Sequence, residues 1–288
     1  MRLPERYYPH SEHGPIVMRE MPALRYRELA PAAPLRHAIA CYWQIDGQLG
    51  AETQRHRVLP DACADILFDL AAWRAASDAI AGRIVGTMTR ARRVAFSGRV
   101  DLIGIRFRPG GAPLVCAQSL AEFTDMATSA DLWLGSLASP LTDELAGLGD
   151  FRPRAQAFDR HLLAMPRGYP LDRLAVRATQ LLAAGEPDEA RVRAVARTLG
   201  LSERQMERRF AVATGLTPAV YRRVLRFRRL LEIRESGQDW AGAAAEAGYY
   251  DQPHMTREFT RFTGVSPRAW SAEQARVGFL QESAVTLR

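Results

Sequence analysis

One pattern of residues occurs twice in this sequence, 49 positions apart, and it limits the fold more than any other feature. The pattern consists of Met, Arg, Phe, Thr, Gly and Pro, in the first copy Met206, Arg208, Phe210, Thr214, Gly215 and Pro218. The second copy has the same types at Met255, Arg257, Phe259, Thr263, Gly264 and Pro267. Self-similarity at a fixed spacing indicates that one supersecondary unit is built twice.

The second copy predicts a helix, a tight turn and another helix. Its first helix has apolar residues at helical spacing, which form one stripe: Trp240, Ala243, Ala244 and Ala247. Gly248 supplies a left-handed residue that ends this helix, and Asp251 is a good N-cap for the next one. The buried side of the next helix is expected at Met255, Phe259 and Phe262. A Gly in the turn between two helices is typical of a helix-turn-helix unit.

The first copy predicts the same unit. The stripe of its first helix is formed by Val192, Val195, Ala196 and Leu199. Gly200 marks the turn and Ser202 caps the second helix, whose buried side chains are expected to be Met206 and Phe210.

A single helix is predicted between the two copies. Thr217 caps it, Pro218 takes the first helical position and Gly237 ends it. About 18 residues span ~27 Å at 1.5 Å per residue, so this helix can set two recognition helices about one DNA turn apart. Five arginines surround it, some expected to reach phosphates and others only to solvate the surface or to pair with Glu232 and Glu235: Arg222, Arg223, Arg226, Arg228 and Arg229.

The positive charge of the chain is concentrated in the repeat. The whole chain has 39 basic and 32 acidic residues and a net charge of +7. Residues 191–270 hold 15 arginines against 8 acids, whereas residues 1–170 hold 20 against 18. A local basic excess favours a polyanionic partner. Exposed Arg and Gln on a helix can pair with guanine and adenine in the major groove. The alternative is that these are the solvated faces of ordinary helices, which two copies and the basic excess make the weaker interpretation.

Residues 171–270 resemble the DNA-binding domain of the AraC/XylS family of bacterial transcription regulators. In that family two helix-turn-helix units are joined by a long helix, and AGYYDQPHMTREFTRFTGVSP, residues 247–267, is close to the family signature. The resemblance implies a sequence-specific regulator that binds double-stranded promoter DNA and contacts RNA polymerase. It implies base-reading positions at Arg204, Glu207, Arg208, Gln252, His254 and Arg257. Glu207 departs from the family, which often has a neutral or basic residue there, and a Glu would suit cytosine.

The N-terminal half predicts a small β unit, a barrel or a sandwich. Its short segments are rich in β-branched and aromatic residues: CYWQID, HRVLP, ADILFDL, GRIVGTM, RRVAFSG and VDLIGIRFRPGGA. In the last segment, alternation places Asp101, Ile103, Ile105 and Phe107 on one face. Residues 119–148 and 154–166 then become helical, either to pack on this unit or to pair with a second subunit. We expect a homodimer held through the helices between 120 and 165.

This half resembles the sensor-like domain of uncharacterised function that precedes the DNA-binding domain in one AraC subgroup. The matching pieces are Tyr42-Trp43, LPDACADILFD and RFRPGGA. The resemblance implies an α+β multidomain chain. A cupin-like barrel with helices, which binds a small-molecule effector or only dimerises, would occupy residues 1–165. The all-α double helix-turn-helix domain would occupy residues 171–288, after a linker at 165–172.

Candidate ligand-binding residues lie near the apolar strands: Trp43, Asp61, Asp65, Arg106 and Arg108. The alternative is structural, with Asp61 capping a turn and Arg106 pairing with an acid. His10 and His13 with His56 or Cys63 are too weak a pattern for a metal, so we expect no metal and no cofactor.

The sequence argues against an enzyme and against a membrane protein. Alkyl-transfer repair proteins with a related DNA-binding domain need a Pro-Cys-His-Arg context, which Cys41, Cys63 and Cys116 lack. These cysteines form no CxxC pair and lie in apolar segments, where inert buried thiols are commoner than thiol sensors. No GxSxG, HExxH or P-loop motif, signal peptide or membrane-length apolar run occurs, so we expect a non-enzymatic cytoplasmic protein.

Overall fold

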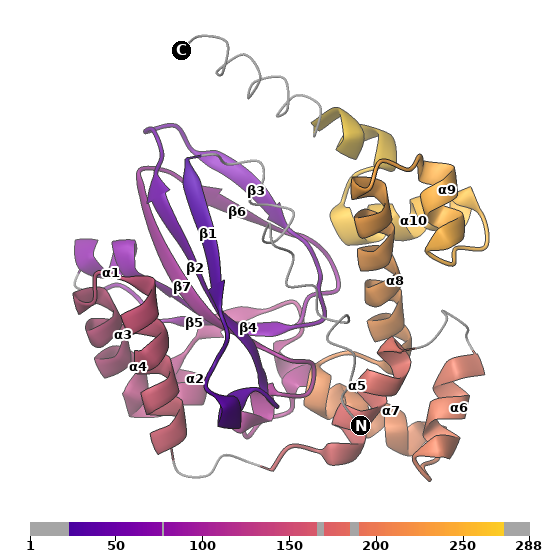
Figure 1. Ribbon diagram of the computed structural model, residues 1–288, viewed down its shortest axis with the longest axis horizontal. Coiled ribbons are helices and arrows are strands. Elements are labelled where there is room, and N and C mark those ends of the chain that lie inside the picture. The colour runs from indigo at the N-terminus through magenta and orange to yellow at the C-terminus, as the bar shows by residue number, and fades with distance from the viewer. Residues whose placement is uncertain (1–22, 77, 166–169, 185–189, 274–288) are drawn as a thin grey trace.

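The chain forms a sheet-rich N-terminal domain beside a helical C-terminal domain (Figure 1). This computed structural model describes residues 23–76, 78–165, 170–184 and 190–273. The predicted linker at 165–172 lies largely outside the described residues.

The N-terminal domain contains one six-stranded antiparallel sheet and one two-stranded antiparallel ribbon. The sheet has the order β1-β2-β7-β4-β5-β8. Its strands are β1 (Leu24–Leu29), β2 (Ile39–Gln48), β4 (Ala64–Asp69), β5 (Arg83–Val85), β7 (Arg99–Phe107) and β8 (Ala127–Ser129). The ribbon pairs β3 (Gln54–Val58) with β6 (Arg92–Phe96). Every predicted strand segment contains a strand. β1 was not predicted, and β8 corrects the prediction that residues 119–148 are helical, because Ala127–Ser129 pair with β5.

The α+β prediction is confirmed, but among the described residues the sheet is not closed into a barrel. Its edge strands, β1 and β8, do not pair with each other. Both β5 and β8 have only three residues, so this side of the sheet offers too few backbone hydrogen bonds for closure.

The two faces of the sheet bury different side chains. Ile103, Ile105 and Phe107 of β7 lie on one face, as their alternation predicted, and belong to the main apolar core. Cys41 and Trp43 of β2 lie on the opposite face in a smaller cluster. β2 and β7 are each buried on both faces, which fits their positions inside the sheet.

Helices cover the main-core face of the sheet. The α-helices of this domain are α1 (Leu70–Ala75), α2 (Asp131–Leu134), α3 (Ala138–Gly147) and α4 (Phe151–Ala164). Short 3-10 helices join the elements: η3 (Ala33–Leu35), η4 (Ala112–Leu114), η5 (Leu120–Phe123) and η6 (Gly135–Leu137). Leu145 of α3 and Phe158 of α4 are fully buried in the same core as Ile103. The apolar face of these helices therefore packs on the sheet.

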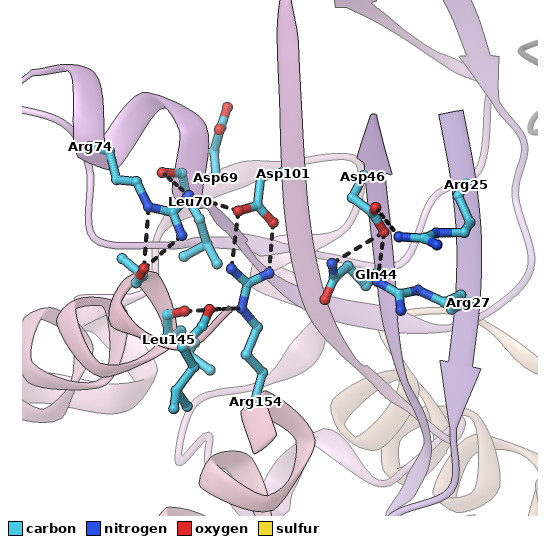
Figure 2. Close-up of polar contacts among 12 residues, drawn as sticks. Arg25, Arg27, Gln44, Asp46, Asp69, Leu70, Arg74, Asp101, Leu145 and Arg154 are labelled. Atoms are coloured by element: carbon cyan, nitrogen blue, oxygen red, sulfur yellow. Dashed lines mark hydrogen bonds and ion pairs between the residues drawn. The ribbon is translucent and has the colours of Figure 1, made fainter. Parts of the chain in front are cut away.

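One buried carboxylate attaches these helices to the sheet. Asp101 of β7 accepts hydrogen bonds from Arg154 of α4, 2.7 Å from Nη1 to Oδ1, and from Arg74 of α1, 2.7 Å from Nη1 to Oδ2 (Figure 2). Arg154 is 2% exposed and also donates through Nε to the carbonyls of Leu145 and Leu148. Burial alone raises the pKa of Asp101, but the hydrogen bonds from the two arginines outweigh it and hold that pKa below its ordinary value.

The C-terminal domain is helical throughout its described part. Its helices are α5 (Arg173–Ala183), α6 (Ala190–Thr198), α7 (Glu203–Thr214), α8 (Pro218–Glu235), α9 (Trp240–Glu246) and α10 (Gln252–Thr263). The predicted caps are confirmed, since Ser202, Thr217 and Asp251 each accept a backbone hydrogen bond in the first turn of α7, α8 and α10. Gly215 and Gly264 end α7 and α10 with φ of 77° and 78°.

Asp101→Ala should cost about 3–5 kcal/mol of unfolding free energy, because the Arg154 guanidinium would be left buried without its carboxylate. Chemical denaturation of the full chain measures this loss. Asp46→Ala is the matched control (Figure 2), because Asp46 pairs with Arg25 and Arg27, whose side chains are 65% and 33% exposed. It should cost about 1 kcal/mol or less.

The same carboxylate should contribute to acid sensitivity. The folded-state pKa of Asp101 is lowered, so its stabilisation is complete above the ordinary carboxyl pKa and is lost as pH falls through the folded value. The stability of Asp101→Asn should therefore fall less steeply with acid than that of the parent. Parallel pH curves for the two proteins would refute this.

Candidate nucleic-acid interface

The first recognition helix, α7, is fixed by its cap and its buried side. Ser202 Oγ accepts the amide of Gln205, and Gln205 Oε1 accepts the amide of Ser202, which completes a capping box. Met206 and Phe210 are 1% and 0% exposed, so one face of the helix is fully used for packing. The opposite face is left for solvent or a partner.

The predicted base-reading residues of α7 lie on that outer face. Arg204, Glu207 and Arg208 are all exposed, at i, i+3 and i+4 spacing on one side of the helix. Within the described chain, none of their side chains makes a hydrogen bond or an ion pair. Two neighbours differ, since Glu203 pairs with Arg193 at 2.9 Å and Arg209 pairs with Asp172 at 2.8 Å.

The second recognition helix, α10, is built in the same way. Asp251 Oδ1 accepts the amide of His254, and Met255 and Phe259 are fully buried. Gln252 and Arg257 are exposed, and neither side chain forms a polar contact with another described residue. The imidazole of His254 is half-buried because it lies edge-on to the ring of Tyr249, with centroids 5.5 Å apart.

Glu258 attaches α10 to α8, which the sequence did not predict. Its side chain is 3% exposed and its carboxylate oxygens accept from Arg223 Nε at 2.6 Å and from Arg226 Nη2 at 2.9 Å. Arg226 also lies over the ring of Tyr249, 4.6 Å from its centroid. These two arginines therefore pair inside the domain, with a carboxylate that was not among their expected partners.

Helix α8 packs against both helix-turn-helix units. Its 18 residues include a buried stripe along its length: Tyr221, Val224, Phe227, Leu230 and Leu231. Phe227 contacts Phe259 of α10, and Tyr221 contacts Phe210 of α7, both edge to face. One helix thus packs against both recognition helices, as Figure 1 shows with α7 near one end and α10 near the other.

Four of the five predicted ligand-binding residues meet in the N-terminal domain. Trp43 Nε1 donates to Asp65 Oδ1 at 2.7 Å, and Arg106 Nε lies 3.3 Å from the same oxygen. Arg106 also lies 3.6 Å from Asp61 Oδ2, while Asp61 Oδ1 accepts the amide of Cys63. Arg108 lies apart, and its Nε donates to the carbonyl of Arg36.

The polar atoms of this cluster largely satisfy one another. Burial raises the pKa of the Asp65 carboxyl, with Asp61 adding to the shift and Arg106 opposing it. Both structural alternatives hold, since Asp61 caps a turn and Arg106 pairs with acids. The cluster supplies two carboxylates for one guanidinium, so it holds one carboxylate more than Arg106 can pair with by charge.

The cysteines and histidines form no further site in the described part of the chain. Cys41, Cys63 and Cys116 are free and buried, and burial raises the pKa of each thiol, for Cys116 to about 11. No cluster of metal-binding side chains is found among the described residues, and His10 and His13 lie outside them. In that same part of the chain, every helix is too short or too polar to cross a bilayer.

The neighbours Arg257 and Glu258 should differ sharply in their effect on stability. Glu258→Ala should cost about 3 kcal/mol, because two partly buried arginines would lose their carboxylate. Arg257→Ala should change stability by less than about 0.5 kcal/mol, since the side chain is exposed and unpaired within the described chain. Thermal melts of both variants check this, and a large loss in Arg257→Ala would instead assign Arg257 to packing.

Two family models match the chain, and no curated protein does. A domain of unknown function (DUF6597) matches residues 27–129, and a helix-turn-helix domain matches residues 195–273.

Among solved structures, the chain is similar to ToxT from Vibrio cholerae. One ToxT structure at 1.65 Å resolution has 8% identity and a TM-score of 0.40, over 86% of this chain and 96% of that one. A ToxT structure with bound unsaturated fatty acid has 8% identity and a TM-score of 0.36, over 86% and 93%. Likeness this weak carries no argument about function. The helix-turn-helix match falls on the doubled units described above, so residues 195–273 are similar to an AraC-type helix-turn-helix domain, behind a domain of unknown function.

Proposed function

We propose that the chain is a sequence-specific transcription regulator whose residues 171–288 bind duplex promoter DNA through α7 and α10. One observation carries the proposal. Five of the six predicted base-reading side chains are exposed, and none of the six is engaged in a hydrogen bond or ion pair within the described chain, although their neighbours Glu203, Arg209 and Glu258 are. Charged side chains kept clear of internal partners on two equivalent helices are suited to an external partner.

The residue types suggest what each helix would read. Arg208 and Arg257 occupy equivalent positions in the two units, and each could pair bidentately with guanine. Gln252 is suited to adenine, and Glu207, whose carboxylate only accepts hydrogen bonds, is suited to the amino group of cytosine. The remaining arginines on the surface of the domain would contact phosphates, which position the protein without selecting sequence.

We propose residues 1–165 as the regulatory half, with a small-molecule effector at the cluster of Trp43, Asp61, Asp65 and Arg106. This effector site is supported by its charge, because two carboxylates, of Asp61 and Asp65, face one guanidinium, of Arg106, in a largely buried cluster. In the second candidate function this half serves only to dimerise. The apolar face of α3 and α4 already packs on the sheet, so it does not support the homodimer that was predicted through these helices. We propose the homodimer and the contact with RNA polymerase from the resemblance to the AraC/XylS family.

An enzymatic role has less support. The thiolate, and not the thiol, is the nucleophile in cysteine chemistry, and burial disfavours the thiolate at Cys41, Cys63 and Cys116. We therefore propose a non-enzymatic regulator that acts in the cytoplasm, where promoter DNA is found.

Binding of the full chain to duplex DNA should depend steeply on salt. Arginines that displace counterions from phosphates should make affinity fall about 10³-fold or more between 50 and 200 mM salt if six or more phosphates are contacted. Cognate sites would first be selected from random duplexes with the full chain. The absence of binding even at low salt would contradict the proposed function.

Arg257→Ala should relax base preference at one position of the selected site. Loss of a bidentate pair with guanine should cost about 1–3 kcal/mol there, whereas loss of a phosphate contact would weaken all sequences about equally. Affinities for single-base variants of the site separate these outcomes. Arg152→Ala, an exposed arginine on α4, is the matched control and should change neither affinity nor preference.

A further inference from the structure

The N-terminal domain contacts the C-terminal ends of both recognition helices through one small element, which we call the bracket. The bracket consists of residues 86–91, between β5 and β6, and residues 124–126, between η5 and β8. These two segments lie 40 residues or so apart in sequence and side by side in the fold, because β5 pairs with β8.

The bracket holds α7 by two hydroxyl groups. Thr87 Oγ1 donates to the carbonyl oxygen of Thr214 at 2.7 Å, and Thr124 Oγ1 donates to that of Gly215 at 2.6 Å. Thr87 is 0% exposed, so this bond is shielded from water. The acceptors are carbonyls that the end of a helix leaves without an intrahelical donor.

The bracket holds α10 by a backbone amide. Ala91 N donates to the carbonyl oxygen of Phe262 in the last turn of α10, at 2.6 Å. An ion pair between Arg57 of β3 and Glu273 adds a second link to this unit. Both recognition helices therefore end on the same few residues of the N-terminal domain.

The two segments of the bracket are bonded to each other. Asp125 joins its two segments, since its carboxylate accepts the amide of Thr89 at 2.7 Å and its own amide donates to the carbonyl of Thr87 at 3.0 Å. Asp125 adopts the left-handed region, with φ of 59°. At Gly86, an added Cβ would lie 1.8 Å from the carbonyl oxygen of Phe123, so the backbones are in direct contact.

The two units are attached unequally. Gly215 is buried, and a Cβ there would lie 3.0 Å from Thr124 Oγ1 and 3.1 Å from Thr87 Oγ1. Its counterpart Gly264 is exposed and has nothing within 4 Å of that position. The first unit is thus seated in the N-terminal domain, whereas the second has the looser contact with it.

We propose that Thr87, Thr124 and the Ala91 amide are positioning residues that set the separation of the two recognition helices, and thereby the spacing of the DNA windows they read. The DNA part of this inference rests on the proposed function. Helix α8 alone leaves each unit free to tilt at its ends, and the bracket removes that freedom by fixing the far ends of α7 and α10. A change in the N-terminal domain that moved the bracket would change the spacing without touching a base-reading residue.

The separation can be measured without DNA. Spin labels on Val212→Cys and Thr260→Cys would report the distance between α7 and α10 in the full chain, since both sites are exposed and the native cysteines are buried. The labelled parent should give one narrow distance distribution. The labelled protein with Thr87→Val and Thr124→Val should give a broader one, because the two hydroxyl donors are gone.

Thr198→Val is the matched control, because its hydroxyl donates only to the carbonyl of Ala194 within α6. It should leave the distribution narrow. If the double variant does not fold by thermal melt, the single Thr124→Val, at a half-buried position, replaces it. A distribution as narrow as that of the parent in a folded variant would overturn the proposal.

A second experiment tests the consequence for DNA. One base pair is inserted between the two windows of a selected site, and affinity is measured for the unlabelled proteins. The affinity of the parent should fall about tenfold, the equivalent of one mismatched position. The affinity of the protein with Thr87→Val and Thr124→Val should fall clearly less. An equal loss in both would overturn the role in spacing. If neither protein binds DNA, the proposed function fails, while the label distances still decide whether the bracket positions the helices.

Discussion

Helix α8 has to bury an apolar face against two separate units at once, and the arrangement of the C-terminal domain depends on this constraint. Tyr221 and Phe210 meet near the start of α8, and Phe227 and Phe259 meet near its middle. Burial of large aromatic side chains is the main stabilising term available to a small helical unit. Neither unit can therefore move far along α8 without exposing aromatic surface, and what remains adjustable is the tilt of each unit.

Polar contacts attach each helix-turn-helix unit to its neighbours, and these contacts differ between the two units although their sequences repeat. In the first unit, Arg209 pairs with Asp172 before α5; in the second, the equivalent position is Glu258, which pairs with Arg223 and Arg226 of α8. The repeat thus conserves the local geometry of cap, turn and buried side. It uses opposite charges to attach each unit to a different neighbour.

The sequence could predict contacts between neighbouring residues, but not contacts between residues that are far apart in the chain. Ser202, Thr217, Asp251 and the two left-handed glycines act within a few residues, so the helix boundaries were predictable. Glu258 was not predictable, because its partners are 32 and 35 positions away and its repeat counterpart is an arginine. The contacts of the bracket join residues such as Thr87 and Thr214, 127 positions apart, and carry no local signal. β8 has three residues and β1 is mostly half-buried, which explains why neither showed a clear alternation.

The position of the N-terminal domain limits how it could act on DNA binding. It contacts the C-terminal ends of α7 and α10, while Arg204, Gln252 and Arg257 stay exposed nearer the N-terminal ends or on the outer face. A domain that leaves the proposed base-reading face uncovered would not act by simple occlusion in this arrangement. It can act on the equilibrium between relative positions of the two helices, and an effector would do so only if it bound those positions with different affinity. The carbonyl groups at the two helix ends would transmit such a change, because they accept the hydrogen bonds that join the N-terminal domain to α7 and α10. The buried aromatic contacts along α8 would meanwhile keep each unit folded as its position changed.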